Sequence, residues 1–407
     1  MNPLTKEEIQ KRNFRNVQID GVGVSISNIS APFLPVFLTR LGATNFQVSL
    51  LTSMPGVTGL ILAIVVGRFL QTRKNIVHWY SISRLLVILC YALTGILTLL
   101  IAEKYVILST LAIWAFATLP QTALAVAFSV VMNAVAGPEG RYALLSRRWA
   151  IFGFTGVIGT FIVTRVINLL NFPINYATMF LVLSLGGFVS FYFSRKIVVP
   201  DQVAPPMADT RSLAEIFRNY ISLVRANPAF ASFASKRFVY FSALVLTQPI
   251  MPLFFVREVD ATDAQIGTIT MAMTLVMLVG YYVWPLASRR WGGRFVLLAT
   301  TFGMILYPAL TAAVPHVGWI IIFAGVAGFF QAGLDLVFFD ELMKTVPAEY
   351  SATFVSLAQS MQYLSTILAP LIGTWLASYI GLGGALWLSA GLRLFGFLLF
   401  LKKDVKR

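Results

Sequence analysis

The chain has 407 residues, of which 58% are hydrophobic and only 12% charged. Soluble domains carry about 25% charged residues, so this composition excludes a water-soluble globular protein. Apolar stretches of about 18 residues or more, long enough to cross a bilayer as helices, recur along the chain. The composition therefore predicts an all-α polytopic membrane protein.

We expect twelve transmembrane helices with short connections between most of them. Their approximate ranges are 17–38, 46–67, 76–100, 106–134, 149–169, 175–195, 229–256, 264–287, 295–314, 317–343, 352–379 and 384–401. The predicted domains are an N-terminal six-helix bundle (1–195), a cytoplasmic linker (196–228) and a C-terminal six-helix bundle (229–407). In the linker, Ser212 and Glu215 fit a capping box before an apolar helical face, which predicts an amphipathic helix on the membrane surface.

The basic residues are distributed unevenly. Net charge is +15, and 25 of the 31 Lys and Arg residues fall in segments on the same side as both termini. This positive-inside bias predicts a multi-pass protein of the cell (inner) membrane with cytoplasmic termini. The placement makes membrane lipid, and not nucleic acid, the expected partner of the basic charge. Cys90 is the single cysteine, so a disulfide within the chain is excluded.

Two segments occur twice. Pro32–Arg40 recurs as Pro249–Arg257, 217 positions later, with Pro, Pro, Phe and Arg at the same spacing. The prolines should weaken or kink the outer ends of spans one and seven. Gln121–Phe128 recurs as Gln331–Phe338, 210 positions later. The chain is therefore a six-plus-six duplication, and parallel halves of this kind are related by a pseudo-twofold axis along the membrane normal.

This architecture resembles the major facilitator superfamily. The loop at Gly67–Lys74 and the loop at Leu286–Arg294 resemble that family's repeated loop motif, although Gln71 replaces the Asp of the first copy and the second also lacks it. The segment Glu139–Arg141 resembles its loop between spans four and five. The resemblance implies a transporter whose spans one, four, seven and ten line a central path. It also implies a cytoplasmic gate, for which the candidates are Arg141, Arg289 and Glu341.

Polar side chains on these four spans should turn away from lipid. The candidates for a substrate path are Asn28, Trp114, Gln121, Tyr240, Gln248 and Gln331. Hydrogen bonding between packed helices is the alternative explanation for them. Aromatic residues are frequent on spans four and ten, which favours an amphipathic or weakly polar substrate.

Asp335 is the candidate for proton coupling, because a carboxylate inside a span must be paired, hydrated or protonated. The alternative is a static ion pair, for example with Arg237. Asp20 is a second coupling candidate, but pairing with Arg84 is the first expectation for it. Arg393, in the last span, is expected to snorkel or to pair with an acid.

The sequence predicts a secondary active transporter that moves a small organic solute by alternating access, coupled to protons. The alternatives are a sensor or scaffold that does not transport, and an uptake permease for a polar solute such as a sugar or organic acid. An enzyme is not expected, because His78 and His316 lie far apart and no catalytic motif is present. We expect no cofactor, no metal and a monomer.

Overall fold

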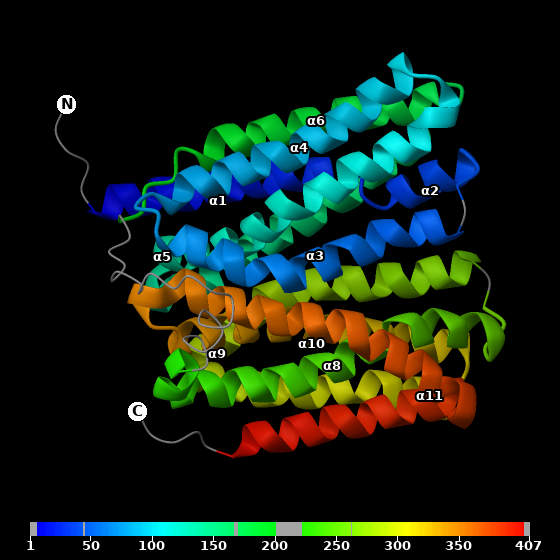
Figure 1. Cartoon of the computed structure of the whole chain (residues 1–407). Coiled ribbons are helices and arrows are strands. Elements are labelled where there is room, and N and C mark those ends of the chain that lie inside the picture. Colours follow the sequence, from blue (N-terminus) through cyan, green and yellow to red (C-terminus); the bar gives the residue numbers. More distant parts are fainter. Residues whose placement is uncertain (1–5, 44, 167–169, 201–221, 262, 403–407) are drawn as a thin grey trace. The chain divides into compact units, whose positions relative to one another are not determined.

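The computed structural model describes residues 6–43, 45–166, 170–200, 222–261 and 263–402, which are almost wholly helical (Figure 1). They divide into two compact units: residues up to 203 with 350–360, and residues 204–349 with 361–407. The first unit holds α1 (Lys6–Asn28), α2 (Phe33–Arg40), α3 (Asn45–Gln71), α4 (Ile76–Leu100), α5 (Glu103–Val166) and α6 (Ile174–Ser194). The second holds α8 (Pro228–Arg257), α9 (Asp263–Ala313), α10 (Val317–Thr345) and most of α11 (Ser351–Leu401), which follows a short 3-10 turn, η2 (Ala348–Tyr350).

Three of these elements are pairs of helices. Gly137 in α5, Gly292 in α9 and Gly381 in α11 have φ of 64°, 83° and 76°. A side chain disfavours this left-handed backbone, so glycine is required where each pair turns. Nine elements of the described chain are long and apolar enough to cross a membrane, α1 with α2 being counted as one. Because three of the nine are pairs, the twelve-helix fold expected from the sequence is confirmed.

The repeated prolines act differently in the two units. α1 ends at Asn28 and α2 begins at Phe33; between them the Ser30 and Ala31 amides bond three residues back, at 3.2 and 3.0 Å. Pro32 lacks an amide hydrogen and so cannot continue the helical ladder. α8, in contrast, runs through both of its prolines to Arg257. The predicted weakening is thus confirmed for the first copy, whereas the second copy has no interruption and its kink stays a prediction.

α1 packs against α5 and α6 in the first unit. A Cβ on Gly23 would lie 2.5 Å from the carbonyl oxygen of Gly186 in α6, and one on Gly156 of α5 would lie 3.3 Å from Ser25 Oγ. Only helices without side chains at these positions can approach so closely. The glycines therefore fix α1 tightly between its neighbours.

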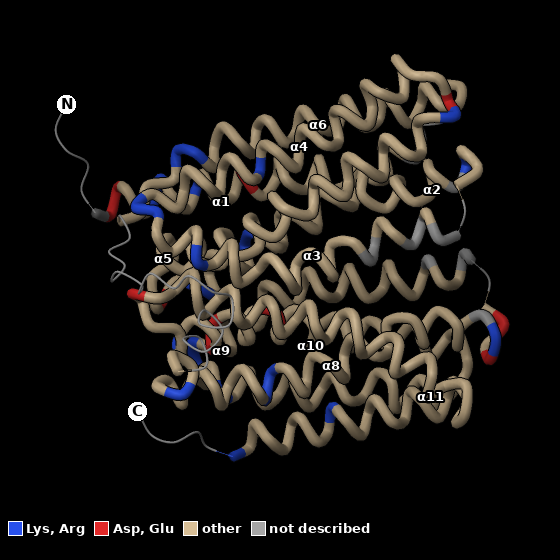
Figure 2. Tube along the Cα trace, viewed as in Figure 1, with Lys and Arg blue, Asp and Glu red and all other residues tan. Residues whose placement is uncertain are grey.

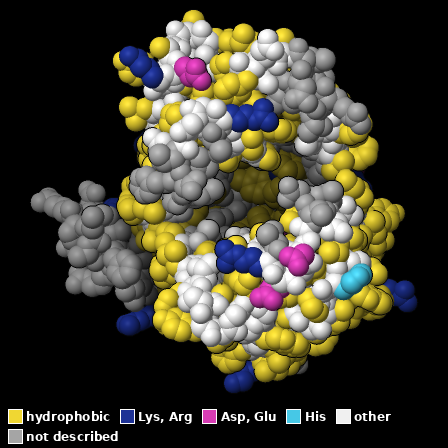
Figure 3. Space-filling view, turned by 90° about the vertical axis from the view of Figure 1, so that its right-hand side faces the viewer, with side chains coloured by type: hydrophobic (Ala, Val, Ile, Leu, Met, Phe, Trp, Pro, Cys, Tyr) yellow, Lys and Arg dark blue, Asp and Glu magenta, His cyan; other side chains and the backbone are white. Residues whose placement is uncertain are grey.

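The charged residues gather at one end of the helices in each unit. Figure 2 shows Lys and Arg concentrated where α1 begins and α11 ends. Figure 3 shows the opposite helix ends, where charged side chains are few among hydrophobic ones. The sides of the helices carry exposed apolar residues such as Ile61, Phe154 and Tyr379, as a lipid-facing surface requires. The predicted amphipathic helix of the linker lies outside the described residues, except that residues 222–226 are helical.

Candidate functional site

Asp335 lies well inside α10, and its side chain is exposed. Gln331, one turn earlier, donates from Nε2 to Asp335 Oδ1 at 2.7 Å. Tyr281 of α9 donates its hydroxyl to Oδ2 at 3.0 Å. Both donors are neutral, so the carboxyl group is held in place while its charge is not offset by an ion pair.

The expected alternative, an ion pair between Asp335 and Arg237, is not formed. The guanidinium of Arg237 lies over the ring of Phe338, with 5.7 Å from Cζ to the ring centroid. Within the described ranges, no salt bridge involves Asp335. The sequence pattern on α10 indicated Gln331 as a neighbour, but it held no signal for Tyr281, which lies 54 residues away.

The predicted path residues fall into two groups. Asn28 and Gln248 are exposed, and Gln121 and Gln331 are partly exposed. The two aromatic candidates, in contrast, are packed inside their units. Trp114 is 8% exposed and packs edge-to-face on Tyr91, and Tyr240 is 0% exposed and donates to the Thr301 carbonyl oxygen at 2.6 Å. Burial gives those two a role in helix packing, whereas the amide residues keep accessible surface.

Asp20 belongs to a buried charge cluster in the first unit. The predicted pair with Arg84 is confirmed, with 3.5 Å between Nη2 and Oδ2. Arg148 of α5 is a second cation at 3.3 Å, and the hydroxyls of Tyr80 and Ser190 donate to the same carboxylate at 3.0 and 2.5 Å. Asp20 is 0% exposed, so this cluster is sealed from solvent. It joins α1, α4, α5 and α6 through a single carboxylate.

Arg393 differs from its expectation. It is 2% exposed and neither snorkels nor pairs with an acid of the described chain. Its Nη1 donates to the Met304 carbonyl oxygen at 2.7 Å, and its Nη2 donates to Thr247 Oγ1 at 2.8 Å. Snorkelling is prevented because the side chain is enclosed by α8 and α9, where uncharged acceptors are within reach.

The three gate candidates have separate surroundings. Arg141 is buried and donates from Nε to Asn133 Oδ1 at 2.8 Å. Glu341 accepts from Lys344 at 2.7 Å, while Arg289 is exposed and takes part in none of the ion pairs of the described chain. Nothing in these contacts joins the three into one gate, so the gate assignment stays a prediction.

Gln71, which stands where the family motif has an acid, is 2% exposed. Its Oε1 accepts from the backbone amide of Thr353 at 3.3 Å. A Cβ on Gly67, one turn earlier, would lie 3.1 Å from the Ala352 carbonyl oxygen. The loop motif that carries Gln71 in place of an acid therefore makes a close contact between α3 and the first turns of α11 through a neutral amide.

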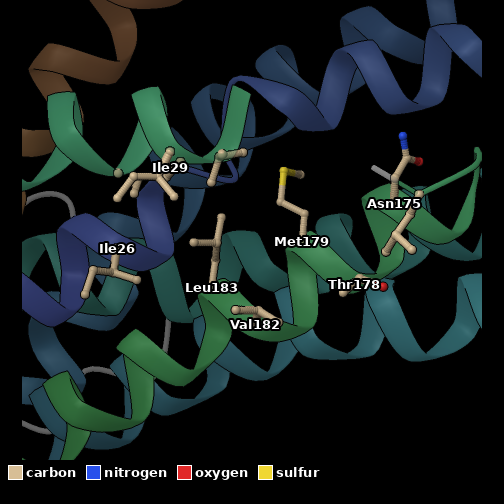
Figure 4. Close-up of a pocket in the computed structure, with 11 residues that line it drawn as sticks. Ile26, Ile29, Asn175, Thr178, Met179, Val182 and Leu183 are labelled. Atoms are coloured by element: carbon tan, nitrogen blue, oxygen red, sulfur yellow. The ribbon is translucent and has the colours of Figure 1, made fainter. Parts of the chain in front are cut away.

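A cavity of the first unit lies among α1, α5 and α6 (Figure 4). Its volume is about 290 Å³, and Ile26, Met179, Val182 and Leu183 line most of its labelled length, with Asn175 toward one end. Val182 is 56% exposed on the outside of the unit. Since the lining is almost wholly apolar, this cavity is not a site for a polar solute. No group of three His, Cys, Asp or Glu side chains suited to a metal occurs in the part of the chain that is described.

Residues 237–407 match the sequence model of the Major Facilitator Superfamily. This part of the chain is therefore similar to the major facilitator superfamily. No curated protein matches it. The matching family is one of membrane transporters, and solved structures that share the fold of this chain are transporters as well.

Solved structures of superfamily transporters share the fold over nearly the whole chain. The human organic anion transporter MFSD10 (TETRAN) has a TM-score of 0.76 at 12% identity, covering 96% of this chain and 99% of that one. The Escherichia coli fucose:proton symporter FucP has a TM-score of 0.76 at 13% identity, covering 95% and 97%. A bacterial homologue of the iron transporter ferroportin, in an outward-facing state, has a TM-score of 0.74 at 14% identity, covering 97% and 98%. At these identities the likeness is one of fold.

Proposed function

We propose that the protein is a secondary active transporter that moves a small organic solute by alternating access, coupled to protons at Asp335. One observation carries the proposal: Asp335 is an exposed carboxyl group inside a membrane-spanning helix, held only by neutral donors. A carboxylate at membrane depth costs about 2.5–3.5 kcal/mol on insertion scales. With no cation to offset that cost, proton binding is the available way to neutralise it.

The geometry suits a reversible proton site. Gln331 and Tyr281 each occupy one oxygen of Asp335, so the carboxyl group stays oriented whether or not it carries a proton. Accessible surface lets protons and solute arrive. Asp20 lacks this access and already has two cations, so the proposal keeps Asp335 as the coupling residue and gives Asp20 a role in holding the first unit together.

The substrate path is proposed to use Asn28, Gln121, Gln248 and Gln331, which retain exposed surface. Amide side chains both donate and accept hydrogen bonds, so they suit polar groups of an uncharged or weakly charged solute. The surrounding spans are rich in aromatic and aliphatic residues, which favours an amphipathic or weakly polar substrate. Trp114 and Tyr240 are left out because they are packed within their units.

The remaining parts of the proposal follow from the charge distribution. The basic ends of the helices are proposed to face the cytoplasm, so that both termini lie on the cytoplasmic side of the cell (inner) membrane. The membrane-facing surface is proposed to contact lipid, and the protein is proposed to act as a monomer. A fold shared with a fucose:proton symporter is compatible with proton coupling.

Proteoliposomes with an imposed pH gradient and a trapped pH-sensitive dye test the coupling. L-fucose, benzenesulfonate and glucose are added in turn, and the lumen of wild-type vesicles is expected to acidify with at least one of them. Asp335→Asn should abolish this acidification, whereas Asp335→Glu, which keeps a titratable group, should retain part of it. Gradient dependence unchanged in Asp335→Asn would refute the coupling role. Solute binding without any flux in the wild type would favour the non-transporting alternative.

A further inference from the structure

Three arginines inside the spans are accompanied by oxygen acceptors. Arg84 and Arg148 share Asp20, at 3.5 and 3.3 Å. Arg393 donates to the Met304 carbonyl oxygen and to Thr247 Oγ1. A guanidinium at membrane depth is costly unless its charge is paired or hydrogen-bonded, and these three satisfy that requirement within the chain.

Arg237 differs from these three arginines. It lies nine residues beyond the first residue of α8, about 14 Å along the helix. Its Nε is buried without a hydrogen-bond partner, and no salt bridge in the described chain includes it. Its guanidinium contacts the ring face of Phe338, whose own side chain is 6% exposed. Because Arg237 is partly exposed, an acceptor from outside the chain can reach it.

We infer that Arg237 binds the anionic group of the transported solute, so the substrate class is a small organic anion with an apolar body. This rests on the proposed function and names the substrate for it. The guanidinium offers five N–H donors in a planar fork, which matches a carboxylate, sulfonate or phosphate in two-point contact. The Phe338 ring beneath it holds the fork in one orientation, so little side-chain freedom is lost when the anion binds.

The placement links Arg237 to the proton site. Phe338 is three residues beyond Asp335 on α10, so the two occupy neighbouring positions on one side of that helix. An anion at Arg237 and a proton at Asp335 then enter the same unit with opposite charges. Carrying the anion and the proton together leaves the net charge inside the membrane unchanged. Arg237 and Asp335 can each take up a partner in this way because they do not form an ion pair with each other.

A lipid headgroup phosphate shares this chemistry and is the other source of an anion. The exposed amide of Gln248 and the partly exposed amide of Gln331 in the same unit favour a soluble solute, because a lipid anchored at the surface has no need of polar groups inside the spans. The experiment therefore includes a lipid arm.

Thermal unfolding of the purified full chain in maltoside detergent measures binding. The probes are benzoate and benzenesulfonate, with benzamide and benzenesulfonamide as their neutral counterparts. Hydrogen bonds from the Arg237 guanidinium to a charged acceptor should make the wild type bind each anion at least about tenfold more tightly than its neutral counterpart. Arg237→Met should lose this preference, and Arg290→Met, which removes an exposed arginine stacked on Trp291, should keep it. Asp335→Asn should also keep it.

The unliganded Arg237→Met protein provides a second readout. Removing an unpaired charge from a span should leave the melting temperature unchanged or higher, whereas an arginine with a purely structural role would lower it. The inference is overturned if no anion shifts the wild type, if neutral probes bind equally well, or if Arg237→Met retains the preference. It is also overturned if phosphatidylglycerol, added to the maltoside micelles without any probe, reproduces the shift in melting temperature and abolishes benzoate binding. Loss of proton coupling in the vesicle assay, with the anion preference intact, would count against the proposed function and leave this inference standing.

Discussion

The buried cluster around Asp20 gives the sharpest stability prediction. Asp20→Asn keeps the shape of the side chain and one acceptor oxygen, but it removes the negative charge that faces two guanidinium groups. Both arginines are within 3.5 Å of Oδ2, and all three side chains are nearly or fully buried. Breaking a buried pair by removing one partner costs roughly 3–5 kcal/mol. We expect Asp20→Asn to lower the free energy of unfolding by about 3 kcal/mol.

Glu7 and Lys11 form a matched control in the same helix. Their atoms are closer, at 2.7 Å, but their side chains are 75% and 76% exposed. Exposed pairs contribute about 0–1 kcal/mol, so Glu7→Gln should change stability little despite the shorter distance. Burial, and not distance, is therefore the quantity that the comparison isolates.

A double-mutant cycle with Arg148→Met tests the same reasoning. Arg148→Met leaves one arginine facing one carboxylate, so Asp20→Asn should cost less in that background than in the wild type. Unfolding is followed by tryptophan fluorescence in mixed micelles. A cost for Asp20→Asn below about 1 kcal/mol, or one that is equal in both backgrounds, would refute the electrostatic account.

Two further predictions concern single contacts. Tyr281→Phe removes a donor that orients the Asp335 carboxyl group, so proton-coupled flux should fall about tenfold while solute binding is kept. An unchanged flux would argue against the contact. Arg393→Leu removes a buried charge that has only neutral acceptors, so it should lower the free energy of unfolding by less than about 2 kcal/mol, which is less than the effect of Asp20→Asn. A larger decrease in the free energy of unfolding would show that the bond to Thr247 matters more than the charge.

Much of the fold followed from the sequence because its determinants are local. Apolar runs define the spans, and Gly292 and Gly381 lie in or next to short connections where a turn was expected. The difference between the proline copies could not be read from the sequence, since it depends on how Ser30 and Ala31 bond in three-residue turns beside Pro32.

The site was less predictable because its contacts join distant segments. The Asp20–Arg84 pair was expected from the depth of both residues, but Arg148 lies 128 positions from Asp20, in a basic segment between two predicted spans that gives no sign of a partner. No motif in the sequence singles out Tyr281. The alternative of an ion pair between Asp335 and Arg237 was wrong, because an amide and a hydroxyl group donate to the two oxygens of Asp335 instead.

On the proposed mechanism, the charges of the second unit that lack an ion-pair partner would also determine how transport responds to voltage. Arg237, Arg393 and an ionised Asp335 together carry one net positive charge inside the spans. A proton on Asp335 and a monovalent anion at Arg237 cancel, so the loaded and empty forms would cross the field with the same charge. Moving one extra charge through 100 mV costs roughly 2.3 kcal/mol, and this arrangement avoids that difference between the two half-cycles. The pH gradient alone, and not the membrane potential, would then set the level to which the solute accumulates.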